Sequence, residues 1–304
     1  MQELKGVYVP ICTPYTDGKV DIYKLESNME KFYQTNLQGY FALGSNGENC
    51  LLTEDEKKKV LSTILKRRSR NQLVMAGCSH ESTRGTIELA KWVASIGAEI
   101  GSVLSPHYFK KSMSDEAIVK FFEDVADNSP IPIVIYNAPG FAGGLAISVN
   151  AMTKLSKHPN ILGMKDSTTN GPSAFLIYVD KKFAVMAGSA DIFLTTLVMG
   201  GVAGVLSIAN FHPDACCKLY DLYIQGKMEE ARYFQYAISR LNKSVSGKNG
   251  VAGVKTGMDL VGLHGGDPRL PLLPLNIEEK RNIFNALSRF EEEYPEFKAD
   301  LIKP

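Results

Sequence analysis

Short apolar runs rich in β-branched residues alternate with longer amphipathic runs along almost the whole chain. The short runs have the length of buried strands, and the longer ones have the apolar spacing of helices. Eight successive βα units predict a closed (β/α)8 barrel, an α/β fold. The strand-like runs are 6–11, 39–43, 72–76, 99–104, 131–136, 161–165, 183–187 and 204–207.

A helix-like run follows each strand-like run, and the second one opens with Thr53 and Glu56, which form a capping box. An open doubly wound sheet is the alternative fold, but it usually places a G-x-G-x-x-G loop after its first strand. Here Cys12-Thr13-Pro14-Tyr15 follows that strand, which favours the barrel. The helix-like runs are 21–35, 53–66, 82–96, 114–127, 148–156, 172–179, 191–199 and 213–224.

The chain continues as helix beyond the eight units, with further helix-like runs at 228–245, 251–261 and 277–292. No low-complexity linker separates them from the preceding units. We therefore expect a barrel over residues 1–226 and a C-terminal helical extension over 227–304, packed on the barrel.

The charge balance argues against a polyanionic partner. Lys and Arg total 34 and Asp and Glu total 33, for a net charge of +1. No excess of one sign attracts nucleic acid or an anionic membrane, and no apolar run reaches the roughly 18 residues that a membrane span requires. We expect small-molecule partners, with no nucleic acid and no membrane.

Neither a leader nor a disulfide framework is evident. The first residues lack the apolar region of a signal peptide, so we expect a cytoplasmic protein. The five cysteines include no C-x-x-C pair, and the five histidines show no ligand spacing. Free thiols in a reducing compartment, without zinc, fit this arrangement.

Catalytic residues of a barrel lie where strands end and βα loops begin. Lys165 ends the sixth strand-like run, which is otherwise apolar. Inside a barrel mouth its amine is partly desolvated, which favours the neutral form that attacks carbonyls. The alternative is a surface lysine just beyond the strand.

Tyr136 ends the fifth run, one βα step before Lys165, so the two strands are predicted to be neighbours about 4.8 Å apart. A phenol there can reach the lysine and its substrate adduct and can transfer protons. The alternative is a ring packed between sheet and helix, but the agreement of two strand ends favours catalysis.

The second run leads into Gly44-Ser45-Asn46-Gly47-Glu48. Such a glycine-flanked loop can direct N–H groups and hydroxyls inward and bind an anion such as a carboxylate. An ordinary turn is the equal alternative. At later strand ends Gly188 allows close approach of a ligand, and Asp191 is expected to be an N-cap.

These features together resemble the pyruvate-dependent class I aldolases, the family of dihydrodipicolinate synthase and N-acetylneuraminate lyase. The family has a G-x-x-G-E loop after strand two, Y-N-x-P after strand five and a lysine ending strand six. The resemblance extends from Gly6 to about Pro271. The matching segments here are 44–48, 136–139 and 163–167.

The resemblance implies a role for each matching residue. Lys165 matches the Schiff-base lysine, and Tyr136 matches the general acid/base. Ser45 and Asn46 match the loop that holds the oxo-acid carboxylate. Ser45 is also predicted to be a catalytic residue. Tyr108 matches a tyrosine lent to a neighbouring subunit, which implies a homodimer or homotetramer. The predicted substrate-binding set is completed by Ser167, Gly188 and Ser207.

The subfamily is indicated by departures from the pattern. Phe141 stands where the synthases usually carry an arginine that grips the second substrate, and Ala190 and Asp191 stand where the neuraminate lyases carry two acids. The nearer resemblance is to the 4-hydroxy-2-oxoglutarate aldolases. The segments that carry it are 44–48, 158–161, 163–167, 187–190 and 265–269.

The sequence therefore predicts an aldolase that cleaves a 4-hydroxy-2-oxo acid to pyruvate and an aldehyde, without metal or organic cofactor. Two alternatives within the fold are a synthase that condenses pyruvate with aspartate semialdehyde, and a sugar-acid aldolase or dehydratase. A non-enzymatic 2-oxo-acid sensor is the alternative from another class. It has no use for a paired amine and phenol, since an arginine would hold a carboxylate better.

Overall fold

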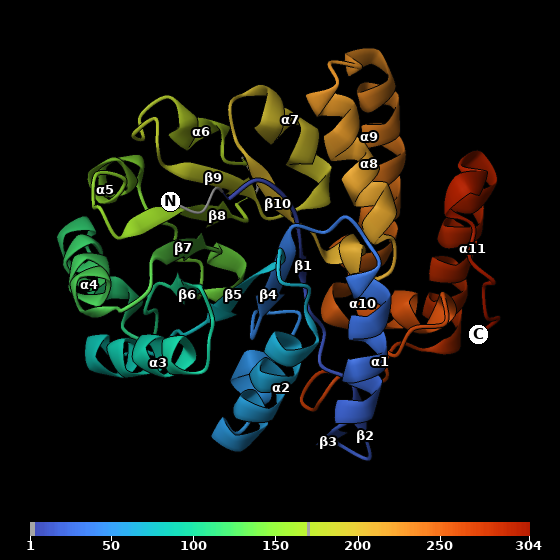
Figure 1. Cartoon of the computed structure of the whole chain (residues 1–304), viewed down its shortest axis with the longest axis horizontal. Coiled ribbons are helices and arrows are strands. Elements are labelled where there is room, and N and C mark those ends of the chain that lie inside the picture. Colours follow the sequence, from blue (N-terminus) through green and yellow to red (C-terminus); the bar gives the residue numbers. More distant parts are fainter. Residues whose placement is uncertain (1–3, 169–170) are drawn as a thin grey trace. The chain divides into compact units, whose positions relative to one another are not determined.

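The computed structural model describes residues 4–168 and 171–304. Within these ranges, eight parallel strands form a closed barrel in the order β1-β10-β9-β8-β7-β6-β5-β4 (Figure 1). The predicted barrel is confirmed, and each strand lies within a few residues of its expected position. The strands are β1 (Gly6–Pro10), β4 (Gly39–Ala42), β5 (Leu73–Gly77), β6 (Ile100–Leu104), β7 (Ile133–Asn137), β8 (Ile161–Asp166), β9 (Ala184–Ala187) and β10 (Ala203–Val205).

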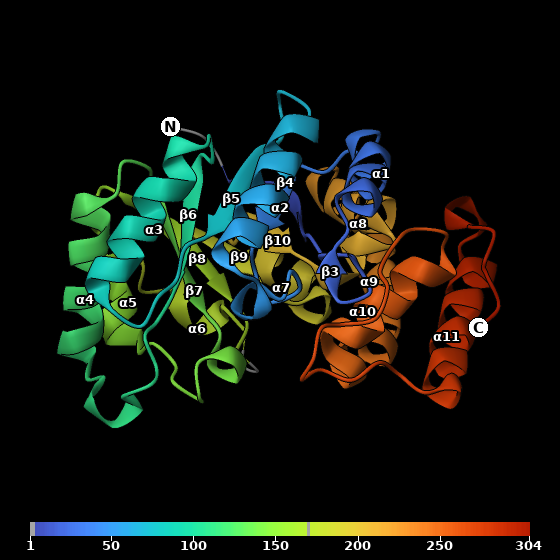
Figure 2. The ribbon, with the colours of Figure 1, turned by 90° about the horizontal axis from the view of Figure 1, so that it is seen from below.

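The chain divides into two compact units. The first consists of Leu73–Val205 with the N-terminal residues up to Lys5. In Figures 1 and 2 its helices α3, α4 and α5 follow one another along the outer side of β6, β7 and β8. Its helices are α3 (Thr83–Ser95), α4 (Asp115–Asn128), α5 (Val149–Leu155), α6 (Ser173–Leu176) and α7 (Phe193–Val198), with 3-10 turns η2 (Lys110–Ser112), η3 (Pro139–Phe141) and η4 (Ala190–Ile192).

The second unit consists of Gly6–Gln72 and Leu206–Pro304. It holds β1, β4 and a short hairpin of β2 (Tyr15–Thr16) and β3 (Lys19–Val20). Its helices are α1 (Ile22–Tyr33), α2 (Glu54–Arg67), α8 (Pro213–Ile224), α9 (Met228–Asn242), α10 (Lys248–Leu260) and α11 (Ile277–Glu293), with 3-10 turns η1 (Asn49–Leu51), η5 (Ser207–Asn210) and η7 (Pro295–Phe297) and the π-helix η6 (Lys243–Gly247).

The helices begin where the sequence predicts because side chains satisfy their first N–H groups. Thr53 and Glu56 form the predicted capping box of α2. Ser82, Ser114 and Ser148 cap α3, α4 and α5, each accepting a hydrogen bond from the N–H three residues on.

The expected N-cap at Asp191 is wrong. Ser189 caps the turn η4, and its hydroxyl accepts a hydrogen bond from the Asp191 N–H at 3.3 Å. The chain begins to turn before Asp191, because a 3-10 turn precedes α7. Asp191 therefore lies inside the turn.

The C-terminal helical part is confirmed, whereas its boundary at residue 226 stays a prediction. The sequence predicts a break between residues 245 and 251, but the π-helix η6 joins α9 to α10 there. Gly250 has a positive φ of 54° within this junction. A Cβ on Gly253 would lie 2.3 Å from the Val245 carbonyl oxygen, so only glycine fits this close approach.

The strands are buried on both faces, as parallel strands covered by helices must be. Every residue of β1, β4 and β7 is buried. Among the described residues, no helix has the length and apolar character needed to cross a membrane.

Candidate active site

Lys165 and Tyr136 lie opposite each other on neighbouring parallel strands of the first unit. Residues Tyr136 of β7 and Lys165 of β8 are paired in register. The Lys165 Nζ atom lies 3.8 Å from the centre of the Tyr136 ring. The side chains are only 5% and 6% exposed, so the surface-lysine alternative is wrong. The predicted adjacency of the two strand ends is confirmed.

The next pair in register, Asn137 and Asp166, is also joined directly. Asn137 Nδ2 donates a hydrogen bond to Asp166 Oδ1 at 2.7 Å, and Thr168 Oγ1 donates one to Asp166 Oδ2 at 2.7 Å. Burial raises the pKa of the Asp166 carboxyl above its ordinary value, against the opposite effect of these two hydrogen bonds. Neither residue is among the predicted site residues, although both directly follow predicted ones.

Gly188, the first residue after β9, contacts the end of β8 closely. Its N–H donates to the Asp166 carbonyl oxygen at 2.7 Å. A Cβ there would lie 2.0 Å from Ser167 Oγ and 2.5 Å from the Asp166 carbonyl oxygen. The protein's own packing is thus sufficient reason for a glycine at this position, and its predicted contact with substrate stays a prediction.

Two aromatic residues of the first unit project from βα loops. Tyr108 is 79% exposed, and its ring meets that of Phe109 edge to face at 5.0 Å. The N–H groups of His107 and Tyr108 both donate to Glu81 Oε2 at 2.9 Å, which fixes the backbone below the ring. Phe141, on the turn η3, is 57% exposed.

The glycine-flanked loop belongs to the second unit. The N–H groups of Gly47 and Glu48 donate to carbonyl oxygens within the loop, at Gly44 and Ser45. These two N–H groups are therefore not free to bind an anion. The Asn46 Nδ2 group is buried without a hydrogen-bond partner among the described residues. A buried amide donor without an acceptor is unusual and favours a bound oxygen ligand.

A buried ion pair anchors the last residue of this loop. Glu48 and Lys255 are joined at 2.7 Å, and neither side chain is exposed. Lys255 Nζ also donates to the carbonyl oxygens of Thr13 and Asp267. The second carboxylate oxygen of Glu48 accepts from the Arg269 N–H at 2.7 Å. All charges and donors of the pair are thus satisfied.

Ser207 begins the turn η5 of the second unit and is half-buried. Its carbonyl oxygen accepts from Asn210 Nδ2, which also donates to the Pro10 carbonyl oxygen. The predicted site residues are thus divided between the units. Lys165, Tyr136, Tyr108, Ser167 and Gly188 belong to the first unit, and Ser45, Asn46 and Ser207 to the second.

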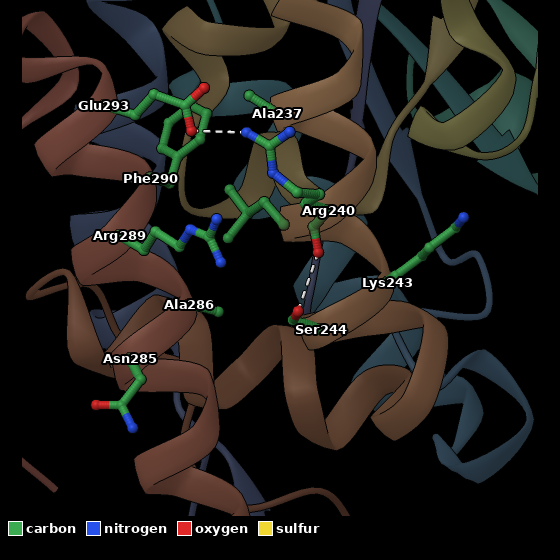
Figure 3. Close-up of a pocket in the computed structure, with 10 residues that line it drawn as sticks. Ala237, Arg240, Lys243, Ser244, Asn285, Ala286, Arg289, Phe290 and Glu293 are labelled. Carbon is green, nitrogen blue, oxygen red and sulfur yellow. Dashed lines mark hydrogen bonds and ion pairs between the residues drawn. The ribbon is translucent and has the colours of Figure 1, made fainter.

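A separate cleft of about 460 Å³ lies between α9, η6 and α11 (Figure 3). Arg240 donates to Glu293 Oε2 at 2.6 Å on its wall. None of the predicted site residues lines it, and among residues 4–168 and 171–304 no three His, Cys, Asp or Glu side chains are grouped to hold a metal ion. The lining residues are Ala237, Arg240, Leu241, Lys243, Ser244, Asn285, Ala286, Arg289, Phe290 and Glu293.

Residues 3–290 match the dihydrodipicolinate synthetase family. The chain belongs to this family. The family resemblance inferred from the strand-end motifs is therefore confirmed. As a family member, the protein is an enzyme of the pyruvate aldolase and lyase group.

The similar proteins within the dihydrodipicolinate synthetase family are named for different reactions. A probable mitochondrial 4-hydroxy-2-oxoglutarate aldolase of Emericella nidulans is 32% identical over 292 residues, which cover 93% of this chain and 94% of the relative. An L-threo-3-deoxy-hexylosonate aldolase of Hypocrea jecorina is 33% identical over 283 residues, covering 88% and 90%. The solved 4-hydroxy-tetrahydrodipicolinate synthase of Methylacidiphilum fumariolicum SolV aligns with a TM-score of 0.90 at 26% identity, covering 97% and 98%.

Proposed function

We propose that the enzyme cleaves a 4-hydroxy-2-oxo acid of the 4-hydroxy-2-oxoglutarate type to pyruvate and an aldehyde, through a Schiff base on Lys165. The observation that carries this proposal is the buried lysine amine 3.8 Å from the centre of the Tyr136 ring. A buried amine beside a phenol provides a nucleophile and a proton-transfer group at one place.

The reaction follows from these two groups. The amine of Lys165 adds to the C2 carbonyl carbon, and Tyr136 gives its proton to the departing C2 hydroxyl, so that loss of water leaves an iminium ion and a tyrosinate. The C3–C4 bond then breaks with its electron pair moving toward the iminium, while Tyr136 accepts the proton of the C4 hydroxyl and the aldehyde leaves. Tyr136 then gives this proton to C3 of the enamine, and addition of water, whose proton returns to Tyr136, releases pyruvate and restores the amine. No metal or organic cofactor takes part in this sequence.

The remaining predicted residues bind the substrate in this proposal. Ser45 and Asn46 hold the oxo-acid carboxylate, and the unpartnered Nδ2 group of Asn46 supports this role. Ser45 also has a catalytic part in proton transfer. Substrate binding is completed by Ser167, Gly188 and Ser207.

Substrate choice is proposed from Phe141. An exposed phenylalanine on the turn η3 stands where the synthases usually carry the arginine that grips their second substrate, which disfavours condensation with aspartate semialdehyde. The name of the Emericella nidulans relative supports an oxoglutarate-type substrate. The second candidate is a sugar-acid aldolase, which the name of the Hypocrea jecorina relative favours.

Assembly and location complete the proposal. The highly exposed ring of Tyr108 supports a homodimer in which each subunit lends a tyrosine to its neighbour, and a tetramer of two such pairs. The cytoplasmic location is proposed from the sequence. Because the Emericella nidulans relative is named mitochondrial, fractionation of cells that express the native gene product decides the compartment.

The decisive experiment offers the purified enzyme pyruvate with a panel of aldehydes and reads the products by mass spectrometry. The panel contains glyoxylate, aspartate semialdehyde and a three-carbon hydroxyaldehyde. Preferential formation of the glyoxylate adduct supports the proposal. Preference for the hydroxyaldehyde selects the sugar-acid aldolase, and no product with any aldehyde rejects aldolase activity.

A further inference from the structure

We infer that Asn137 and Asp166 are positioning residues that lock the register between β7 and β8 and so hold Tyr136 opposite Lys165. This inference rests on the proposed function, because it concerns the geometry of the proposed catalytic pair. Neither residue is proposed to touch the substrate.

The position of the pair follows from the alternation of side chains along a strand. Successive residues point to opposite faces of a sheet. Tyr136 and Lys165 therefore share one face, and the next register pair, Asn137 and Asp166, shares the other. The latter two side chains are 1% and 0% exposed and meet at 2.7 Å. The hydrogen bond thus lies one residue beyond the proposed catalytic pair.

Register needs such a lock here because these two strands do not pair regularly along their whole length. Ile133 pairs with Ile161, but the next residue, Val134, pairs with Gly163, so the register shifts by one at the start of β7. A shift of one residue turns every later side chain to the opposite face. A slip at the other end would separate Lys165 from Tyr136. A specific polar contact at that end excludes this slip.

The pair also ties the two strands to their surroundings. Asn137 Oδ1 accepts from the Ile147 N–H at 3.1 Å, ahead of α5, and the Asn137 carbonyl oxygen accepts from the Ser167 N–H at 2.9 Å. The Asp166 carbonyl oxygen accepts from the Gly188 N–H of the loop after β9 at 2.7 Å. The ends of β7 and β8, the loop after β9 and the segment ahead of α5 are thereby joined through the same two residues.

Filling this space with a buried carboxylate is less favourable than filling it with an apolar side chain. This indicates that the directional hydrogen bonds of Asp166 have a role. Burial of an ionisable group is unfavourable unless its hydrogen bonds are satisfied, and apolar side chains of similar size would fill the volume without that penalty. Asp166 has both oxygens satisfied, one by Asn137 and one by Thr168. Directional bonds of this kind specify one register, whereas apolar packing tolerates several.

The test compares Asn137→Ala with a matched variant at the opposite end of β8. Asn160 immediately precedes this strand, and its Nδ2 group donates to the backbone of Ala126, Ser129 and Ile131. Asn160→Ala therefore also removes a bridging asparagine, but away from Lys165. The readout is the rate at which saturating pyruvate and cyanoborohydride label Lys165, followed by mass spectrometry, with urea unfolding of each variant as the measure of stability.

We expect Asn137→Ala to be labelled about 10²-fold more slowly than the wild type, the usual effect of a misplacement of about 1 Å. Asn160→Ala should be labelled at the wild-type rate even where its stability falls as much. Asp166→Asn retains an acceptor for Asn137 and a donor for the Thr168 hydroxyl, so its Lys165 should be labelled at close to the wild-type rate. If Asn137→Ala does not fold, Thr168→Val tests the same network with an expected loss of about 10-fold.

The outcomes separate this inference from the proposed function. A wild type that takes no label on Lys165 rejects the proposed function, and the inference with it. A labelled wild type with undiminished labelling of Asn137→Ala, or of Thr168→Val in its place, rejects the inference alone. Equal slowing in Asn160→Ala would reveal a general loss of stability, and slowing of Asp166→Asn as severe as that of Asn137→Ala would assign the effect to charge. Either result overturns the register lock.

Discussion

Lys165 and Tyr136 are register partners on adjacent parallel strands, and the lysine nitrogen lies over the face of the tyrosine ring at 3.8 Å from its centre. The face of an aromatic ring carries partial negative charge and attracts a cation. A positive charge that forms on this nitrogen is therefore stabilised by the same residue whose hydroxyl is proposed to move the proton. Mutation of Tyr136 to phenylalanine can separate the contribution of the ring from that of the hydroxyl.

Covalent trapping tests the lysine. Pyruvate with borohydride should add one reduced pyruvyl group to the wild type, mapped to Lys165, because only the imine of that lysine is reduced. Lys165→Ala should take none, whereas Lys154→Ala, which removes an exposed partner of Glu123, should be labelled normally. Peptide mapping by mass spectrometry gives the site, and a label on any other lysine would contradict the assignment.

Removal of the Tyr136 hydroxyl tests proton transfer. Tyr136→Phe keeps the ring over the lysine nitrogen, so imine trapping should persist. Turnover should fall about 10²–10⁴-fold, the usual contribution of a positioned acid or base. Steady-state kinetics and trapping are measured on the same preparation. Turnover near that of the wild type would return Tyr136 to a packing role.

Substrate choice is tested at Phe141. Cleavage of 4-hydroxy-2-oxoglutarate should have a higher kcat/KM than condensation of pyruvate with aspartate semialdehyde. Phe141→Arg should raise the relative kcat/KM for the semialdehyde, because it places at this position the arginine with which the synthases usually grip that substrate. The exposed position of Phe141 accommodates the longer side chain without disturbing the core. A wild type that prefers the semialdehyde would select the synthase alternative.

Subunit mixing tests the role of Tyr108. Lys165→Ala and Tyr108→Phe should each have weak activity alone. In a mixed dimer one site can hold both intact residues if the tyrosine comes from the neighbour. Activity after joint refolding should then exceed the sum of the two parents. Native mass spectrometry confirms that hybrids form, and hybrids without added activity would place Tyr108 within its own subunit's function or outside function altogether.

The ion pair of Glu56 and Arg269 makes stability depend on pH. The Arg269 guanidinium donates two hydrogen bonds of 2.7 Å to this carboxylate, and the Arg269 hydrogen bonds lower the Glu56 pKa from 4.5 to about 2. Because the folded pKa is the lower one, the stabilisation is complete above pH 4.5 and is lost as the pH falls toward 2. Glu56→Gln should lower the free energy of unfolding by about 2 kcal/mol at pH 7.

Urea unfolding from pH 7 to pH 3 measures this dependence. The difference between wild type and Glu56→Gln should shrink steadily below pH 4.5. Glu54→Gln is the matched control on the same helix, since its partner Lys57 is three residues away and the Glu54 side chain is 64% exposed. A difference for Glu56→Gln that is the same at pH 7 and pH 3 would show that the charge of Glu56 is not what stabilises the fold.

The barrel was predictable from the sequence because its signals are local. Parallel strands covered by helices read as continuous apolar runs, and side-chain caps such as Thr53 mark the helix starts. The β2–β3 hairpin escapes prediction, since strands of two residues carry no periodicity. Lys165 was recognisable because a lysine is unusual at the end of an apolar strand, and Tyr136 because it ends the neighbouring strand.

The supporting residues were not predictable in the same way. Asn137 and Asp166 follow the proposed catalytic pair directly, but their importance depends on register, which the sequence does not specify across two strands. Lys255 lies in the helix α10 and is fully buried. Its partner, Glu48, is 207 positions away, and no local pattern connects residues so far apart.

That separation has a consequence for synthesis on the ribosome. The chain emerges from its N-terminus, so Glu48 is made long before Lys255, and Arg269 follows later still. Until then the second unit can close around this carboxylate only by burying an unpaired charge, at a cost of about 3–5 kcal/mol. The loop that holds Ser45 and Asn46 therefore acquires its native support only after Lys255 and Arg269 have been made.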